Sequence, residues 1–305
     1  QEGENVQVYA VDGNFDDAQT GVKRVFADAS VGAELEKRNI RLSSANSINW
    51  GRLVPQIVYY FHAYFRLVEQ GAAAWGQPVD FCVPTGNFGD ILAGYYAKRM
   101  GLPVGKLVCA SNRNNVLTDF IRTGTYDARR EFYKTSSPSM DILISSNLER
   151  LLYHVSGSSE KVSAWMRELA QTGTYTVDAE TLAAIQESFA AGYAGEAECA
   201  EEIRARYEQD GYLCDTHTAV AFRVAEACRG EAPMVVLSTA SPFKFPRDVL
   251  AALGTQAPSG DFAAMAALEK KTGACAPQSL RELDRKPVRF SEIIAPEEIR
   301  AAALR

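Results

Sequence analysis

Two groups of residues in this sequence have the types and the spacing that bind an anion. The first is the loop Pro-Thr-Gly-Asn-Phe-Gly-Asp (84–90), which follows a short apolar run and precedes apolar residues at helical spacing. Backbone N–H groups in such a loop, at the positive end of a helix dipole, suit a phosphate group. A tight turn that uses glycine for backbone freedom produces the same pattern, so the spacing alone leaves both interpretations open.

The candidate phosphate ligands in this glycine loop are Gly86, Asn87, Phe88, Gly89 and Asp90. Their spacing differs from the Gly-x-Gly-x-x-Gly pattern of dinucleotide-binding proteins and from the Gly-x-x-x-x-Gly-Lys-Ser/Thr pattern of P-loops. A nucleotide is therefore not the ligand that the loop predicts.

The second group is Asn46, Ser47, Asn49 and Arg52, which lie within seven residues of one another. Amide and hydroxyl donors at a helix N-terminus, with a guanidinium that can bind a phosphate through two hydrogen bonds, form an anion site. Arg52 is the first candidate for that contact. Ordinary N-capping by Asn46 accounts for the same polar residues without a ligand.

The elements that must position these residues follow from hydrophobic periodicity. Val79–Val83 reads as a buried strand, and Ile91–Arg99 reads as a helix that ends before Gly101 and Pro103. Further strands are expected at Val6–Val11, Ile40–Ala45, Lys106–Ala110 and Val235–Ser238, and helices up to Phe26, after Ser47, after Asn115 and within Lys161–Tyr207. The helix after Ser47 is so rich in apolar residues that we expect it to be buried on most sides.

Strands that alternate with helices predict an α/β protein with a mostly parallel sheet and helices on both faces. Ligands of such sheets bind at the carboxyl ends of the strands. The glycine loop and the segment after Leu237 both lie at such ends.

Composition narrows the function classes. The chain has 305 residues, 47% of them hydrophobic, and a net charge of −6, which favours a globular protein without a basic surface for nucleic acid or membranes. The six cysteines lack Cys-x-x-Cys spacing, and the three histidines are far apart in sequence. We therefore expect reduced thiols, a cytoplasmic location and no metal site.

Six ordered blocks of the sequence resemble threonine synthases, pyridoxal-phosphate enzymes of the tryptophan-synthase-β fold type (fold type II). The blocks are NVQVYAVDGNFDDAQTGVK (5–23), NSINWGRLVPQIVYYF (46–61), PTGNFGDILAGYYAKRMGLP (84–103), MDILISSNLERLLY (140–153), YLCDTHTAV (212–220) and VVLSTASPFKFP (235–246). The resemblance implies that residues 1–45 end a small domain, 46–255 form a large cofactor-binding domain, and 256–305 form a C-terminal extension.

The resemblance also implies roles for both groups of residues. The glycine loop would hold the phosphate of pyridoxal 5′-phosphate, and the segment with Arg52 would hold the phosphate of O-phosphohomoserine. Thr239 would place its hydroxyl against the pyridine nitrogen of the cofactor. The implied reaction converts O-phospho-L-homoserine and water into L-threonine and phosphate. Ser241 and Phe243 replace a histidine and an alanine of the family pattern, so no role passes to them.

The family's Schiff-base lysine lies in a Phe-Lys-Asp motif that does not occur in this sequence. Lys244 matches a different lysine of the family, so no catalytic residue is assigned. We expect a C-terminal portion of a threonine synthase, incomplete at its N-terminus and inactive alone, which self-associates or pairs with the missing N-terminal fragment. The alternatives are a phospholyase that eliminates phosphate without making threonine, and a non-catalytic phosphate-binding protein.

Overall fold

The computed structural model describes residues 4–13 and 15–305, which form two units. The larger unit is Asn46–Arg281, and the smaller combines the chain up to Ala45 with Glu282–Arg305. We expected residues 256–305 to form one extension. The structure divides them instead, because Ala264 and Leu268 are buried in the same hydrophobic cluster as Leu250 of the larger unit.

The larger unit contains a four-stranded sheet in the order β6 (Phe189–Tyr193), β3 (Val104–Ser111), β2 (Val79–Pro84) and β7 (Met234–Val236). All neighbouring strands in it are parallel. The predicted parallel sheet is therefore confirmed, and so is the strand that precedes the glycine loop.

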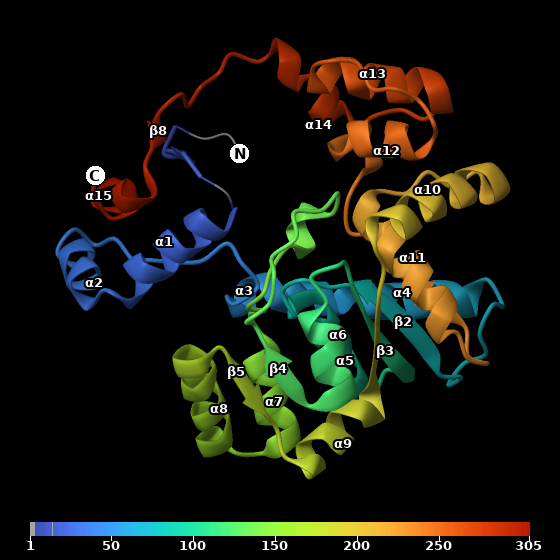
Figure 1. Ribbon diagram of the computed structural model, residues 1–305, viewed down its shortest axis with the longest axis horizontal. Coiled ribbons are helices and arrows are strands. Elements are labelled where there is room, and N and C mark those ends of the chain that lie inside the picture. The colour runs from blue at the N-terminus through green and yellow to red at the C-terminus, as the bar shows by residue number, and fades with distance from the viewer. Residues whose placement is uncertain (1–3, 14) are drawn as a thin grey trace. The chain divides into compact units, whose positions relative to one another are not determined.

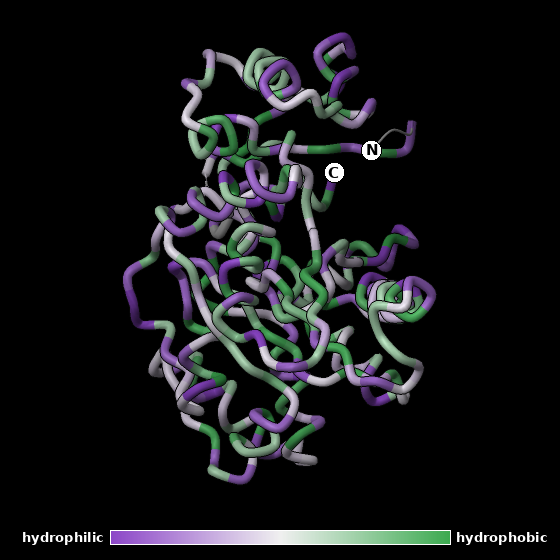
Figure 2. The backbone as a smooth tube through the Cα atoms, turned by 90° about the vertical axis from the view of Figure 1, so that its right-hand side faces the viewer, coloured by the Kyte–Doolittle hydropathy of each residue, from purple (hydrophilic) through white to green (hydrophobic). Residues whose placement is uncertain are grey.

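Helices cover both faces of this sheet, because successive side chains of a strand point to opposite sides. Phe81 and Val83 belong to one buried cluster with residues of α5 (Gly89–Arg99). Cys82 belongs to a second cluster with residues of α11 (Thr216–Cys228). Figure 1 labels these helices, and Figure 2 shows hydrophobic segments crossing the middle of the larger unit.

The remaining elements of the larger unit surround the sheet. They are α3 (Trp50–Leu53), η1 (Val54–Gln56), α4 (Ile57–Glu69), α6 (Val116–Thr123), η2 (Pro138–Met140), α7 (Leu148–Ser156), α8 (Ser159–Thr172), α9 (Ala179–Ser188), α10 (Glu196–Asp210), η3 (Pro242–Lys244), α12 (Pro246–Ala252), α13 (Asp261–Thr272) and α14 (Gln278–Arg281), with the antiparallel pair β4 (Thr125–Asp127) and β5 (Thr174–Thr176).

The helix expected after Ser47 is interrupted, and its predicted burial on most sides is wrong. Pro55 lacks a backbone N–H and restricts the residue before it, so α3 gives way to the short 3₁₀ turn η1 before α4 begins. On α4, Tyr60 and Tyr64 are buried, whereas Val58 and Tyr59 are 62% and 54% exposed.

The smaller unit contains α1 (Phe15–Ala27), α2 (Ala29–Glu36), η4 (Leu283–Arg285), η5 (Pro296–Glu298) and α15 (Ile299–Ala303). Its strands β1 (Ala10–Val11) and β8 (Ile293–Ile294) form a short parallel pair. The strand expected at Val6–Val11 is limited to its last two residues, and residues 40–45 form no strand. Alternating apolar residues predict strands only where a neighbouring strand completes the hydrogen bonds.

Neither a membrane span nor a metal cluster occurs among the described residues. No helix there is long and apolar enough to cross a membrane. No three His, Cys, Asp or Glu side chains in that part of the chain gather in a way that would hold a metal ion.

Candidate functional site

The glycine loop connects the end of β2 to the start of α5 and lines a cavity of about 280 Å³. Within the loop, the Phe88 N–H donates to the Ser146 carbonyl oxygen at 2.8 Å. The N–H groups of Gly86, Asn87, Gly89 and Asp90 have no hydrogen-bond acceptor among the described residues. The first N–H groups of a helix lack partners within the helix, so these groups are available to an anionic ligand.

Both loop glycines lie where a side chain would not fit. A Cβ atom on Gly86 would lie 2.8 Å from the Ser139 carbonyl oxygen, and one on Gly89 would lie 2.2 Å from the Ser47 hydroxyl oxygen. The sequence spacing left open whether these glycines allow a tight turn or allow a ligand to approach the backbone. The structure adds that close packing requires glycine at both positions, while the loop still faces the cavity.

Thr239, in the segment that follows β7, lines the same cavity. β7 pairs with β2, so the segments that follow the two strands meet at one edge of the sheet. The Thr239 side chain has no hydrogen-bond partner among the described residues. A second cavity, of about 520 Å³, shares Gln56, Asp90 and Thr239 with the first.

Only one member of the second predicted group, Ser47, lines the cavity. Asn46 accepts a hydrogen bond from the Ile48 N–H at 3.2 Å, and Asn49 caps α3 by accepting from the Gly51 N–H at 3.0 Å. Arg52 is exposed on α3 and is not among the residues that line the cavity. The structure thus shows capping by Asn49 and brings Ser47 to the glycine loop.

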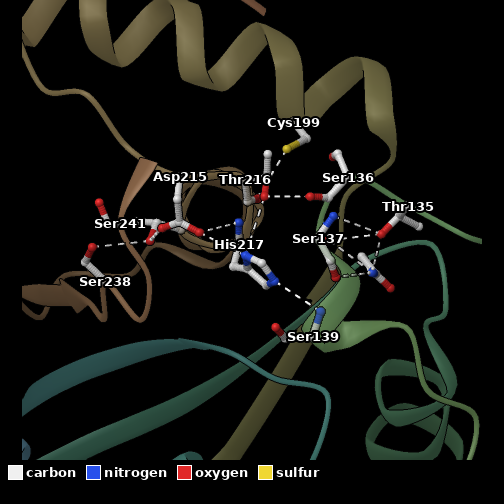
Figure 3. Close-up of polar contacts among 12 residues, drawn as sticks. Thr135, Ser136, Ser137, Ser139, Cys199, Asp215, Thr216, His217, Ser238 and Ser241 are labelled. Carbon is white, nitrogen blue, oxygen red and sulfur yellow. Dashed lines mark hydrogen bonds and ion pairs between the residues drawn. The ribbon is translucent and has the colours of Figure 1, made fainter. Parts of the chain in front are cut away.

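Sequence reasoning missed two buried residues at the start of α11, Asp215 and His217 (Figure 3). His217 lines the cavity and contacts the Asp215 carboxylate through Nδ1 at 2.9 Å. An aspartate directly before a helix is a capping signal, and Asp215 accepts from the His217 N–H. This capping signal, with a histidine two residues later, was the only indication in the sequence that Asp215 and His217 could belong to the site. Lys244 is the one lysine among the described cavity residues.

Asp90 is the carboxyl group of this cavity. Burial raises the pKa of Asp90 from 3.8 to about 6, although the hydrogen bond from the Tyr60 hydroxyl acts in the opposite direction. The Tyr60 hydroxyl lies 2.7 Å from the Asp90 carbonyl oxygen and 3.3 Å from its carboxyl Oδ1. A perturbed carboxyl group in a cavity is typical of a functional site.

The raised pKa predicts how Asp90 affects stability. Between pH 4 and 6 the folded protein retains a proton that the unfolded chain has lost, so the contribution of Asp90 to stability falls as pH rises through this window. Asp90→Asn should therefore raise the melting temperature by a few degrees at pH 7.5 and leave it nearly unchanged at pH 4. Thermal unfolding of both proteins across this pH range measures the effect, and an equal difference at every pH would contradict it.

Comparison with known proteins identifies related chains. The family model described as "Threonine synthase, C-terminal" matches residues 218–302. A relative named "Threonine synthase-like 1" from Macaca fascicularis is 45% identical over 254 residues, which are 82% of this chain and 34% of the relative. A threonine synthase from Schizosaccharomyces pombe is 40% identical over 277 residues, covering 82% of this chain and 52% of the relative.

Two solved structures share the fold. A threonine synthase from Brucella melitensis with bound pyridoxal phosphate matches at a TM-score of 0.80 and 39% identity, over 98% of this chain and 59% of its own. A yeast threonine synthase matches at a TM-score of 0.80 and 33% identity, over 99% and 60%. The fold is therefore that of fold type II enzymes. The chain spans between a third and three-fifths of the length of these proteins.

Proposed function

Because this chain belongs to the threonine synthase family, we propose that it provides the cofactor cradle and the substrate-phosphate site of an enzyme that makes L-threonine and phosphate from O-phospho-L-homoserine and water. The observation that carries this proposal concerns Gly86, Asn87 and Asp90. Their N–H groups have no acceptor among the described residues, and they line one cavity with Thr239. The activity of the whole enzyme is part of the proposal, since the chain spans only part of its relatives.

The residues around the cavity fit pyridoxal 5′-phosphate. The N–H groups of Gly86, Asn87, Gly89 and Asp90 would hold its phosphate, and the Thr239 hydroxyl would contact its ring nitrogen. Phe88 would contribute by anchoring the loop, because its side chain is fully buried and its N–H binds Ser146. When bound, this cofactor supplies an electron sink for carbanion chemistry.

The protein's own contribution is to bind and orient. A neutral hydroxyl such as that of Thr239 accepts or donates a hydrogen bond without forcing the ring nitrogen to stay protonated. Ser47 would bring a hydroxyl from the second group of residues to the glycine loop, since it lies directly over Gly89. If the protein holds the cofactor phosphate and the substrate phosphate in fixed positions, the entropy cost of bringing the reacting groups together is lower.

We propose that Arg52 binds the phosphate of O-phosphohomoserine, with Asn46, Ser47 and Asn49 shaping the turn before it. Arg52→Ala should weaken phosphohomoserine binding by about 1.5 to 3 kcal/mol, the contribution of a charge-assisted hydrogen bond, and leave cofactor binding nearly unchanged. Calorimetric titration with each ligand measures both effects. If Arg52→Ala weakened the binding of O-phosphohomoserine and of the cofactor equally, the two ligands would share one site and the assignment would be refuted.

A second candidate function is a phospholyase that releases phosphate without making threonine. The "Threonine synthase-like 1" relatives, at 44–45% identity, are slightly more similar to this chain than the threonine synthases, at 38–42%, and their name specifies no reaction, so threonine formation itself has to be tested. Assays that follow phosphate release and threonine formation in parallel separate the two functions. Phosphate without threonine, in an enzyme completed with the preceding part of a full-length relative, would favour the phospholyase.

We further propose that the apolar surface beside β7 is covered in the working enzyme, in the cytoplasm, by the remaining part of the fold or by another copy. β7 is an edge strand, and the exposed Tyr59 of α4 lines a cavity together with Val235 and Val236 of β7. Unpaired edges and exposed apolar groups favour association. Sedimentation of the purified chain should therefore detect species larger than 33.3 kDa, whereas a monomer at all concentrations would contradict this.

A further inference from the structure

One segment holds the glycine loop from two sides. We call residues 135–147 the wall segment; they lead from the coil after β4 to the start of α7. Its middle part, Ser139 and Met140, lines the cavity and packs against Gly86. Near its end, Ser145 Oγ donates to the Gly86 carbonyl oxygen at 2.8 Å and the Ser146 N–H donates to Asn87 Oδ1 at 3.1 Å. The position of the loop N–H groups therefore depends on the wall segment.

A buried carboxylate anchors one side of the wall segment. Asp141 accepts hydrogen bonds from the Asn112 side chain at 2.8 Å, the Asn114 side chain at 3.1 Å and the Thr135 N–H at 2.9 Å. Asn112 and Asn114 follow the end of β3. This cluster fixes the wall segment to the sheet, but it does not fix the Ser139 peptide that faces the cavity.

His217 anchors that peptide. The Ser139 N–H donates to His217 Nε2 at 3.3 Å, and His217 Nδ1 lies 2.9 Å from Asp215 Oδ1 (Figure 3). Nε2 must carry the lone pair to accept from an N–H, so Nδ1 carries the proton and donates to Asp215. His217 is 3% exposed, and its imidazole lies 4.9 Å from the Phe245 ring, centroid to centroid.

The same cluster reaches the other wall of the cavity. Asp215 also accepts from the Thr218 hydroxyl, which lies 3.4 Å from Ser238 Oγ. Ser238 precedes Thr239, which lines the cavity three residues after the end of β7. The start of α11 therefore contacts both the wall segment and the segment that follows β7.

We propose that His217 is a positioning residue of the phosphate cradle, whose Nε2 holds the wall segment where it presents the loop N–H groups to the cavity. This inference rests on the proposed function, in which the cradle receives the phosphate of the cofactor. Both ring nitrogens are engaged by protein groups, so His217 acts through the Ser139 peptide and the loop instead of contacting the reacting atoms.

Two substitutions of similar polarity distinguish the role of His217 Nε2 from that of Nδ1. His217→Gln places an amide oxygen near the Nε2 position and can still accept from the Ser139 N–H. His217→Asn places its amide near the Nδ1 position and leaves that N–H without an acceptor. We expect His217→Asn to weaken binding of pyridoxine 5′-phosphate by about tenfold, because the part-buried hydrogen bond that holds the Ser139 peptide in place is lost. His217→Gln keeps an acceptor for that N–H and should bind within about twofold of the original chain.

Pyridoxine 5′-phosphate is the probe because it lacks the aldehyde that would react with surface lysines. Unphosphorylated pyridoxine reports the ring contacts alone, and its affinity should be nearly the same for all three proteins. Thr118→Val is the matched control: it removes a buried hydroxyl that bonds the Gly192 carbonyl oxygen at 2.8 Å, and Thr118 is not a cavity residue. Its binding should match that of the original chain even if its melting temperature falls.

Hydrogen exchange gives a readout without ligand. In His217→Asn, peptides that cover the wall segment and the glycine loop should exchange faster, while His217→Gln should resemble the original chain. Equal binding and equal exchange for the two substitutions would overturn the role of His217 and leave the proposed function standing. A failure of the original chain to bind pyridoxine 5′-phosphate would instead overturn the cradle itself, and the role of His217 with it.

Discussion

Replacing Gly86 with alanine should reduce the affinity for pyridoxine 5′-phosphate by at least about a hundredfold, one of the two largest effects expected. The added Cβ would lie 2.8 Å from the Ser139 carbonyl oxygen and 2.9 Å from the Met140 Cα, both backbone atoms. The loop and the wall segment must then move apart, and the N–H groups that would bind the phosphate lose their common direction. Calorimetric titration of the purified variant measures the loss.

Gly230→Ala is the control for this substitution. Gly230 lies in the turn after α11, and a Cβ atom added to it would have nothing within 4 Å, so an alanine there should leave binding unchanged. Comparable melting temperatures for the two variants would show that the loss at Gly86 is local. If Gly86→Ala binds as tightly as the original chain, the glycine loop is not the phosphate cradle.

The second large effect concerns turnover. The 305-residue chain mixed with pyridoxal phosphate and O-phosphohomoserine should make no detectable threonine, a deficit of more than about a thousandfold relative to an active enzyme. The resemblance to threonine synthases implies that a lysine amine takes part in the chemistry. The Phe-Lys-Asp motif that would carry this lysine does not occur in this sequence. Measuring threonine by chromatography tests this.

Lys244 is the lysine whose reaction with pyridoxal phosphate would contradict this expectation. It lines the cavity, in the short turn η3, and its backbone N–H donates to the Ser241 carbonyl oxygen at 3.0 Å. Borohydride reduction followed by peptide mapping should find no specific adduct at Lys244. A single reduced adduct there, formed together with threonine and lost in Lys244→Ala, would make Lys244 the catalytic lysine of this chain.

The parts of the site that lie on one stretch of sequence were predictable. Val79–Pro84 and Gly89–Arg99 form the strand and helix that their apolar spacing predicts, because burial against the sheet and local helix signals favour the same result. The link between the loop and Thr239 followed from a general rule of parallel sheets, which brings the carboxyl ends of paired strands to one edge.

The parts that depend on distant contacts were not predictable. Nothing in the spacing of residues 135–147 indicates that they pack on Gly86, some fifty residues earlier in the chain. His217 looked like one of three scattered histidines, since its role depends on a Ser139 N–H that the fold brings to it. The apolar pattern around Pro55 favoured one continuous helix. In the structure the proline interrupts it with the 3₁₀ turn η1.

The central claim is that the loop N–H groups bind the cofactor phosphate, and the amide resonances of Gly86 and Gly89 test it most directly. The chain labelled with ¹⁵N-glycine can be titrated with pyridoxine 5′-phosphate and followed by two-dimensional NMR. We expect the amides of Gly86 and Gly89 to shift with saturation while that of Gly230 stays in place. Saturable binding that leaves both loop amides unmoved would contradict the assignment of this loop as the phosphate cradle.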